Sequence, residues 1–225
     1  MRELLRGEPE YKKEESNIEF QNKRQFESDG QQEQYNQQVE KSLQLPERAD
    51  NMKRLFAYLT KTRFLLRDVV KAFVDNKLLY QEGRYNNIVF VGTDVDGNAR
   101  CAGVKSTAGS FRQTLSGTDC SYGFCWRGTG KQLFVFEAAV DLMSFITLYL
   151  ENWQEQNYIA LDGLSAKPLL RFLDERQGVS EVYLCTDNDP AGIEAHGRLR
   201  EQIAEHGHAD KAVFCWPPSH KDWNE

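Results

Sequence analysis

The sequence lacks a long apolar run and an excess of positive charge. No stretch approaches the roughly 20 consecutive apolar residues that span a bilayer, so no membrane partner is expected. The formal net charge is −6 over 225 residues, which argues against a strongly basic protein that coats DNA. A bound metal ion and a local basic strip can still bring an acidic protein to nucleic acid.

Paired cysteines are also missing. The five cysteines are scattered without a Cys-x-x-Cys spacing, and no cysteine or histidine precedes Cys101. The odd count and the lack of a secretion signal favour reduced thiols and a cytoplasmic location. Cys185 and Cys215 lie in expected strands and are interpreted as small core residues.

The first part of the chain is poor in apolar side chains. Residues 1–45 are rich in Gln, Glu, Asn and Lys, so we predict a polar linker that is disordered or partly helical. A small α+β domain is predicted over 46–127, with helices through 52–59 and 65–75. Its hairpin, over 87–92 and 99–105, turns at Asp-Val-Asp-Gly. The Asp-x-Asp there is assigned to the turn, because its glycine is misplaced for a calcium loop.

The most informative stretch is Glu181 to His196, EVYLCTDNDPAGIEAH. A short apolar strand is followed by Asp187 and Asp189, and then by a helix announced by Pro190. Two carboxylates at such a junction lie beside the carboxyl end of a sheet, where open α/β folds keep their sites. An N-cap role for Asp189 explains the same pattern without any site.

A second acid occupies a matching place. The strand expected over 131–136 ends in Glu137, and an apolar helix follows to residue 150. If the two strands are neighbours in a parallel sheet, the carboxylates of Glu137, Asp187 and Asp189 converge. Oxygen ligands without histidine or thiolate suit Mg²⁺ (or Mn²⁺). The chemistry this implies is phosphoryl or nucleotidyl transfer.

Strands and helices alternate from residue 131 to the end. Strands are expected over 158–161, 182–185 and 212–216, with helices between them. This alternation predicts an α/β fold, a doubly wound parallel sheet with helices on both faces. We predict that this domain spans residues 128–225.

A glutamate ending one strand and an Asp-x-Asp ending a later one resemble the Toprim domain of bacterial primases and topoisomerases. Glu137-Ala138-Ala139-Val140-Asp141 is similar to the Glu-Gly-x-x-Asp of bacterial primase, although alanine replaces the glycine. Lys221-Asp222-Trp223-Asn224 resembles a motif that supplies a further acid. Residues 80–105 and 121–124 resemble the domain that precedes Toprim in primase-like proteins of mobile genetic elements.

The resemblance implies a magnesium-dependent, primase-like nucleotidyltransferase of mobile-element DNA replication or transfer. Glu137, Asp187 and Asp189 would be catalytic, Asp222 would join them as a metal ligand, and Asp141 would support the site. Single-stranded DNA, nucleoside triphosphates and replication or mobilisation proteins are the candidate partners. A nuclease using the same metals and a non-catalytic module that binds single strands stay open, as does whether the chain is part of a longer protein.

Basic residues interleaved with aromatics occur over residues 106–131. Such a pattern suits single-stranded nucleic acid, because phosphates meet the charges and bases stack on the rings; an ordinary loop with a charged rim is the alternative. His206 and His208, near a helix end, are interpreted as isolated and solvated. The candidate nucleic-acid contacts are Lys105, Arg112, Arg127, Lys131 and Lys221.

Overall fold

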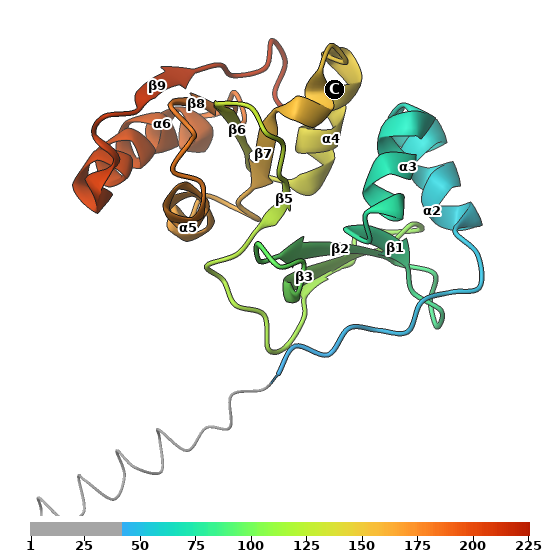
Figure 1. Ribbon diagram of the computed structural model, residues 1–225. Helices are drawn as coiled ribbons and strands as arrows, with labels where there is room; N and C mark the ends of the chain where they lie inside the picture. Colours follow the sequence, from blue (N-terminus) through green and yellow to red (C-terminus); the bar gives the residue numbers. More distant parts are fainter. Residues whose placement is uncertain (1–41) are drawn as a thin grey trace, which may run out of the picture. The chain divides into compact units, whose positions relative to one another are not determined.

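The computed structural model describes residues 42–225, which form one compact unit. Of the linker predicted over 1–45, residues 1–41 lie outside the described residues. Figure 1 labels the elements of the described part. Its helices are α2 (Lys53–Ala57), η1 (Tyr58–Thr62), α3 (Arg67–Asp75), α4 (Ala139–Leu148), η2 (Trp153–Glu155), α5 (Lys167–Glu175), α6 (Pro190–Ile203) and η3 (Ala204–His208).

The first sheet is an antiparallel meander in the order β1-β2-β3-β4. Its strands are β1 (Leu79–Gln81), β2 (Ile88–Thr93), β3 (Ala99–Lys105) and β4 (Arg112–Thr114). The predicted hairpin is β2–β3, and its turn is held by Asp94, whose carboxylate accepts from the peptide nitrogens of Asp96 and Asn98. Assigning this Asp-x-Asp to a turn is therefore confirmed.

The second sheet has the order β5-β7-β6-β8-β9, and only the β5–β7 pair is antiparallel. The chain passes from β6 to β7 on one side and then returns to β8 on the other side of β6. Ligands of open α/β sheets bind at such a switch point, outside the carboxyl ends of the strands. The strands are β5 (Phe124–Trp126), β6 (Gln132–Phe136), β7 (Asn157–Ala160), β8 (Glu181–Leu184) and β9 (Ala212–Cys215).

Alternating side chains of β6 show how the second sheet is covered. Phe134 and Phe136 pack in the cluster that contains α4, whereas Leu133 and Val135 pack in the cluster that contains α5 and α6. Because neighbouring residues of a strand point to opposite faces, helices cover both faces of the sheet; Figure 1 shows α4 on one side and α5 and α6 on the other. The predicted α/β class with helices on both faces is confirmed.

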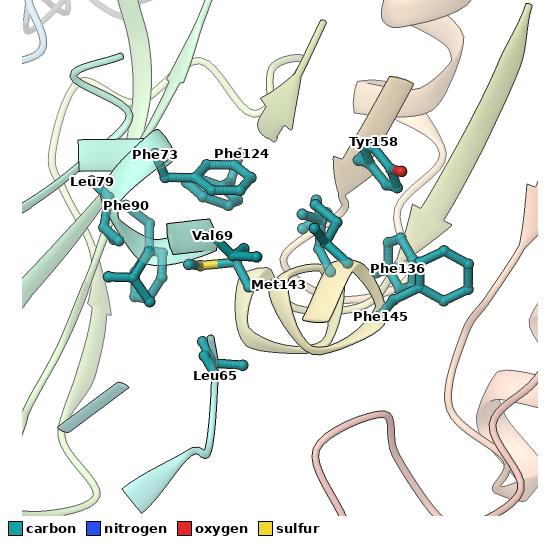
Figure 2. Close-up of a cluster of buried hydrophobic side chains, with 14 of the residues drawn as sticks. Leu65, Val69, Phe73, Leu79, Phe90, Phe124, Phe136, Met143, Phe145 and Tyr158 are labelled. Atoms are coloured by element: carbon teal, nitrogen blue, oxygen red, sulfur yellow. The ribbon is translucent and has the colours of Figure 1, made fainter. Parts of the chain in front are cut away.

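One hydrophobic cluster continues from the first part of the unit into the second. Phe73 of α3 stacks on Phe124 of β5 with ring centroids 5.1 Å apart, and Met143 of α4 belongs to the same cluster as Val69 of α3 (Figure 2). β5, which precedes the boundary predicted at residue 128, is an edge strand of the second sheet. The domain boundary itself stays a prediction.

All five cysteines are free thiols. Cys185 is fully buried, as expected of a core residue, but Cys215 is exposed, so its core interpretation was wrong. The reason is its strand: β9 is the last strand of the sheet and has a neighbour on one side only. Within residues 42–225, the helices are too short or too polar to cross a membrane.

Candidate active site

A cavity of about 790 Å³ opens at the carboxyl ends of β6 and β8. Glu137, Asp141, Asp187 and Asp222 line it on the side of the second sheet. Lys105 and Arg112 line it on the side of the first sheet. Acids and cations predicted from distant parts of the sequence therefore share one cavity.

Glu137 and Asp187 meet because β6 and β8 are neighbours. Val135 pairs with Leu184 in parallel register, which brings the ends of the two strands side by side. The peptide nitrogen of Asp187 donates to Oε1 of Glu137 at 3.1 Å. The two residues lie 50 positions apart in the sequence. Their contact requires the two strands to be neighbours in a parallel sheet, as β6 and β8 are.

Asp189 serves as the N-cap of α6. Its Oδ1 accepts from the peptide nitrogens of Ala191 and Gly192 at 3.1 and 3.0 Å, and Pro190 begins the helix. This is the structural role that the sequence left open. Oδ2 of Asp189 makes neither of these capping bonds, so a carboxylate oxygen remains for a further ligand.

Asp187 carries the clearest sign of a missing partner. Its Oδ1 is buried and has no hydrogen-bond partner, although buried polar atoms are almost always paired. Burial raises the pKa of Asp187, and the charges of Asp222 and Asp189 raise it further. Burial likewise raises the pKa of Glu137, and the negative charges of Asp187 and Asp189 raise it further. A divalent cation would relieve this repulsion and supply the absent partner of Oδ1.

The carboxylates of the cavity do not form a tight cluster of ligand atoms. Among residues 42–225, a group of three or more candidate ligand atoms within 4.8 Å of one another occurs elsewhere in the fold and does not include these carboxylates. Mg²⁺ is usually bound by one or two carboxylates and keeps several waters. The donor set therefore fits a hydrated Mg²⁺ or Mn²⁺, and it does not resemble a closed cage of protein ligands.

Asp141 lies in the first turn of α4 and is buried. Burial raises its pKa from 3.8 to about 7, with further contributions from the charges of Asp187, Asp222 and Glu137. A carboxyl with such a pKa exchanges its proton near neutrality. Asp141 can thus adjust the charge of the site, which accords with the supporting role implied for it.

The raised pKa of Asp141 predicts a pH-dependent stability in chelator-treated protein. The folded state holds this proton up to about pH 7, whereas the unfolded chain releases it near pH 4. The proton's stabilising contribution is full below that range and is lost as the pH rises through it. Between pH 4 and 8, the free energy of unfolding of the wild type should fall by on the order of a few kcal/mol more than that of Asp141→Asn, which lacks this proton. Urea titrations of both proteins at several pH values measure the difference. Parallel curves for the two proteins would contradict the assignment.

The motif at residues 221–224 is held in place by contacts that the sequence did not reveal. The indole of Trp223 donates to the carbonyl of Cys185 at 2.8 Å, next to the Asp187 segment. Nδ2 of Asn224 donates to the carbonyl of Arg63 and to Oγ of Ser144 at 2.8 and 2.9 Å. These bonds hold Asp222 in the cavity wall. Arg63 also lines the cavity and lies 161 positions from Asn224, so no local pattern could have found it.

The five candidate cations are not all in one place. Lys105 and Arg112 are cross-strand partners of β3 and β4. Lys221 adjoins Asp222, and its carbonyl accepts from the peptide nitrogen of Asn188 at 2.8 Å. Arg127 instead pairs with Glu175 at 3.2 Å and is largely buried. Lys131 precedes β6 and so lies at the opposite end of that strand from Glu137.

Ala138, which replaces the glycine of the resembling motif, is in an extended conformation with φ −130°. Any residue adopts this backbone, so alanine causes no strain here. Gly192 is different, because a Cβ added to it would lie 2.0 Å from the carbonyl oxygen of Asp187 and 3.1 Å from Oε1 of Glu137. The close packing of α6 on the acidic loop therefore requires glycine at position 192.

Comparison with known protein families agrees with this geometry. Residues 134–225 match the family described as Toprim-like. Residues 134–225 are a Toprim-like domain. Residues 57–130 match a second family, described as a protein family of unknown function, DUF3991. An uncharacterized protein of Bacillus anthracis is 29% identical over 191 residues, which cover 75% of this chain and 55% of that relative. The chain thus spans about half the length of that relative.

Solved structures similar to the chain include a primase fragment and a primase catalytic core. The primase fragment of the bacteriophage T7 primase-helicase has a TM-score of 0.58 at 18% identity, and the match covers 81% of this chain and 76% of the other. The E. coli primase catalytic core has a TM-score of 0.53 at 14% identity, with 76% and 67% covered. The Toprim-like domain and the segment before it therefore have the fold of a primase catalytic core.

Proposed function

We propose that the protein is a primase-like nucleotidyltransferase that acts on nucleic acid and depends on Mg²⁺ or Mn²⁺. The observation that carries the proposal is the unpartnered, buried Oδ1 of Asp187, in a cavity with acids on one wall and cations on the other. The primase-core fold adds to this support. A further similar structure, at 14% identity, is described as a DnaG primase catalytic domain bound to single-stranded DNA; its TM-score is 0.52, and 76% of this chain and 66% of that one are covered.

The proposed roles follow from position. Asp187, Asp189 and Asp222 would hold the metal, and Glu137 would either join them or act as general acid/base. A divalent ion at such a site neutralises phosphate charge and orients the phosphoryl groups that react. Asp141 would hold or release a proton beside the acids. Lys105 and Arg112 would bind phosphates of the strand across the cavity.

The direct test is nucleotide incorporation on a single-stranded template. Purified protein is incubated with labelled nucleoside triphosphates, template and Mg²⁺ or Mn²⁺, and products are resolved by length. Chain extension that needs the metal and the triphosphates supports the proposal. Shortening of the template without triphosphates would identify a nuclease instead. Absence of both products with either ion would contradict catalysis.

The cationic wall gives a prediction about binding. Arg112→Gln should weaken the affinity for single-stranded DNA. It should also make the negative slope of log K against log salt shallower by about 0.7, because one phosphate contact is lost. Fluorescence anisotropy at several salt concentrations measures both quantities. Lys71→Gln is the control, since Lys71 is an exposed residue of α3 paired with Asp75. An unchanged slope in Arg112→Gln would remove this residue from the interface, and Lys131→Gln measured beside it tests the other end of β6.

A non-catalytic binding module is the second candidate. The capping of α6 by Asp189 favours it, because this acid already has a structural role. In that case binding to single strands would depend on salt but would be indifferent to chelator and to replacement of Asp187.

We further propose that the protein acts in the cytoplasm, in the replication or transfer of a mobile genetic element, with replication or mobilisation proteins as partners.

A further inference from the structure

Three side chains outside the cavity form a compact group of potential metal ligands. Nε2 of His206 lies 3.0 Å from Oδ2 of Asp174, and Nε2 of His208 lies 2.9 Å from Oδ1 of the same carboxylate. The three ligand atoms all lie within 4.8 Å of one another. The two histidines were predicted to be isolated and solvated, and this prediction was wrong. No local pattern indicated Asp174, which lies 32 positions before His206.

The local backbone explains how both imidazoles reach one carboxylate. α6 ends at Ile203, and a wider turn, η3, carries His206 and His208. Between them Gly207 has φ +98°, a conformation that glycine adopts without strain. The ring centroids of the two histidines are 5.7 Å apart. The His-Gly-His sequence therefore turns two imidazole nitrogens toward the end of α5.

The group is anchored on one side and open on the other. The side chain of His208 is only 8% exposed, whereas those of His206 and Asp174 are 44% and 51% exposed. An ion can enter from solvent, and the buried ring fixes one ligand. Partial burial raises the pKa of Asp174, but the hydrogen bonds from His206 and His208 outweigh it and the pKa lies below its usual value. The carboxylate is thus available as an anionic ligand at neutral pH.

The group lies far from the acidic cavity. α6 starts beside the carboxyl end of β8 and runs for 14 residues, which is about 21 Å of helix. The helix runs back along the sheet, so its far end, with His206 and His208, lies toward the amino ends of the strands, whereas Asp187 lies at their carboxyl ends. Neither histidine lines the cavity. Whatever binds here is independent of the proposed catalytic metal.

We propose that Asp174, His206 and His208 form a second metal site, selective for a divalent transition ion of the zinc class. Two imidazole nitrogens and one carboxylate oxygen are the ligands that Zn²⁺ prefers, with water in the fourth position. Zn–N and Zn–O bonds of about 2.0–2.2 Å place tetrahedral donors roughly 3.3 Å apart. Nε2 of His206 lies 3.0 Å from one carboxylate oxygen of Asp174 and Nε2 of His208 lies 2.9 Å from the other, and both distances are close to this value. Mg²⁺ prefers oxygen ligands, so this donor set disfavours it.

Binding requires a change of tautomer and only a small movement. Each Nε2 must present its lone pair to the ion, so the remaining ring proton must reside on Nδ1. The ion would replace the two hydrogen bonds to Asp174 by coordinate bonds. It would then connect the end of α5 to the end of α6. The expected consequence is a more stable Toprim-like domain when the ion is bound.

The test measures Zn²⁺ binding by calorimetry in the presence of excess Mg²⁺, which competes with Zn²⁺ for the carboxylates of the acidic cavity. We expect one equivalent of Zn²⁺ to bind and to raise the melting temperature. His206→Gln and Asp174→Asn should each weaken the affinity at least tenfold, because each removes one of three protein ligands. Both positions are exposed and both replacements retain hydrogen-bonding groups, so the variants should fold. Co²⁺ in place of Zn²⁺ should give the visible absorption of a four-coordinate nitrogen and oxygen site.

Three controls separate this site from other metal ligands. His220→Gln removes an exposed histidine outside the group, and a double Cys120→Ser, Cys215→Ser variant removes the exposed thiols; both should bind Zn²⁺ like the wild type. Asp187→Asn should also leave this binding unchanged. The proposal is overturned if the wild type takes up no Zn²⁺, or if uptake survives in His206→Gln and Asp174→Asn. It is equally overturned if those variants lower the melting temperature while Zn²⁺ leaves the wild type unaffected, since the group would then be an ion-pair clamp.

Discussion

Replacing Asp187 by asparagine is expected to reduce metal-dependent nucleotide incorporation by at least about 10²-fold. The reason is that Asp187 contributes the buried oxygen without a partner, which is the most direct candidate for a metal ligand. The fold should survive, because burial and the nearby Asp222 and Asp189 already disfavour the charged form of this side chain. Incorporation assays and thermal melts of the two proteins, with and without Mg²⁺, measure both effects.

Two further variants make this result specific. Asp162→Asn changes an exposed acid of the same cavity and should leave incorporation nearly unchanged. Asp189→Asn keeps an N-cap, since asparagine caps helices as well as aspartate does, while it removes the charge. Loss of activity in Asp189→Asn without a fall in stability would identify Asp189 as more than a cap. Full activity in Asp187→Asn would remove the proposed catalytic site.

The second large effect concerns stability. Gly192→Ala is expected to lower the free energy of unfolding by about 2 kcal/mol or more, because the new Cβ would lie 2.0 Å from a backbone oxygen of Asp187. A peptide group cannot move aside as the end of a flexible side chain can. The loop that carries Asp187 must shift, so activity should fall together with stability. Urea titration and the incorporation assay test the two parts.

Gly197→Ala in the same helix is the matched control. A Cβ at this position meets nothing within 4 Å, and alanine favours a helix over glycine by about 1 kcal/mol. We therefore expect the same substitution to destabilise at position 192 and to stabilise at position 197. Equal effects of the two substitutions would show that helix propensity, rather than the packing of α6 on the acidic loop, controls the outcome.

Much of the fold could be predicted because periodic patterns and turn chemistry are local. The apolar strands ending at Glu137 and before Asp187, the Pro190 helix start and the Asp-Gly hairpin all have signals within a few residues. Cys215 shows the limit of this reasoning. An apolar strand can be central or at an edge, and only the order β5-β7-β6-β8-β9 decides which.

The site was predictable in its acids and less so in its cations. Acids at strand ends converge because parallel strands share an edge, and this rule needs only the strand order. Arg127 illustrates the difference. It was grouped with Lys105 by the spacing of charges along the chain, but it pairs with Glu175 of α5, a long-range contact without a local signal. Arg63 and Asp174 were missed for the same reason, as were the long-range contacts of Asn224.

The two bonds of Asn224 have a consequence for movement. This residue joins the carbonyl of Arg63, which follows η1, to the hydroxyl of Ser144 in α4. A hinge that widened the cavity by swinging the early helices away from α4 would have to break one of these bonds. Because Asp222 is two residues away, such a motion would also displace an acid of the proposed catalytic group. Strand entry and the assembly of the acidic cluster would then be mechanically coupled.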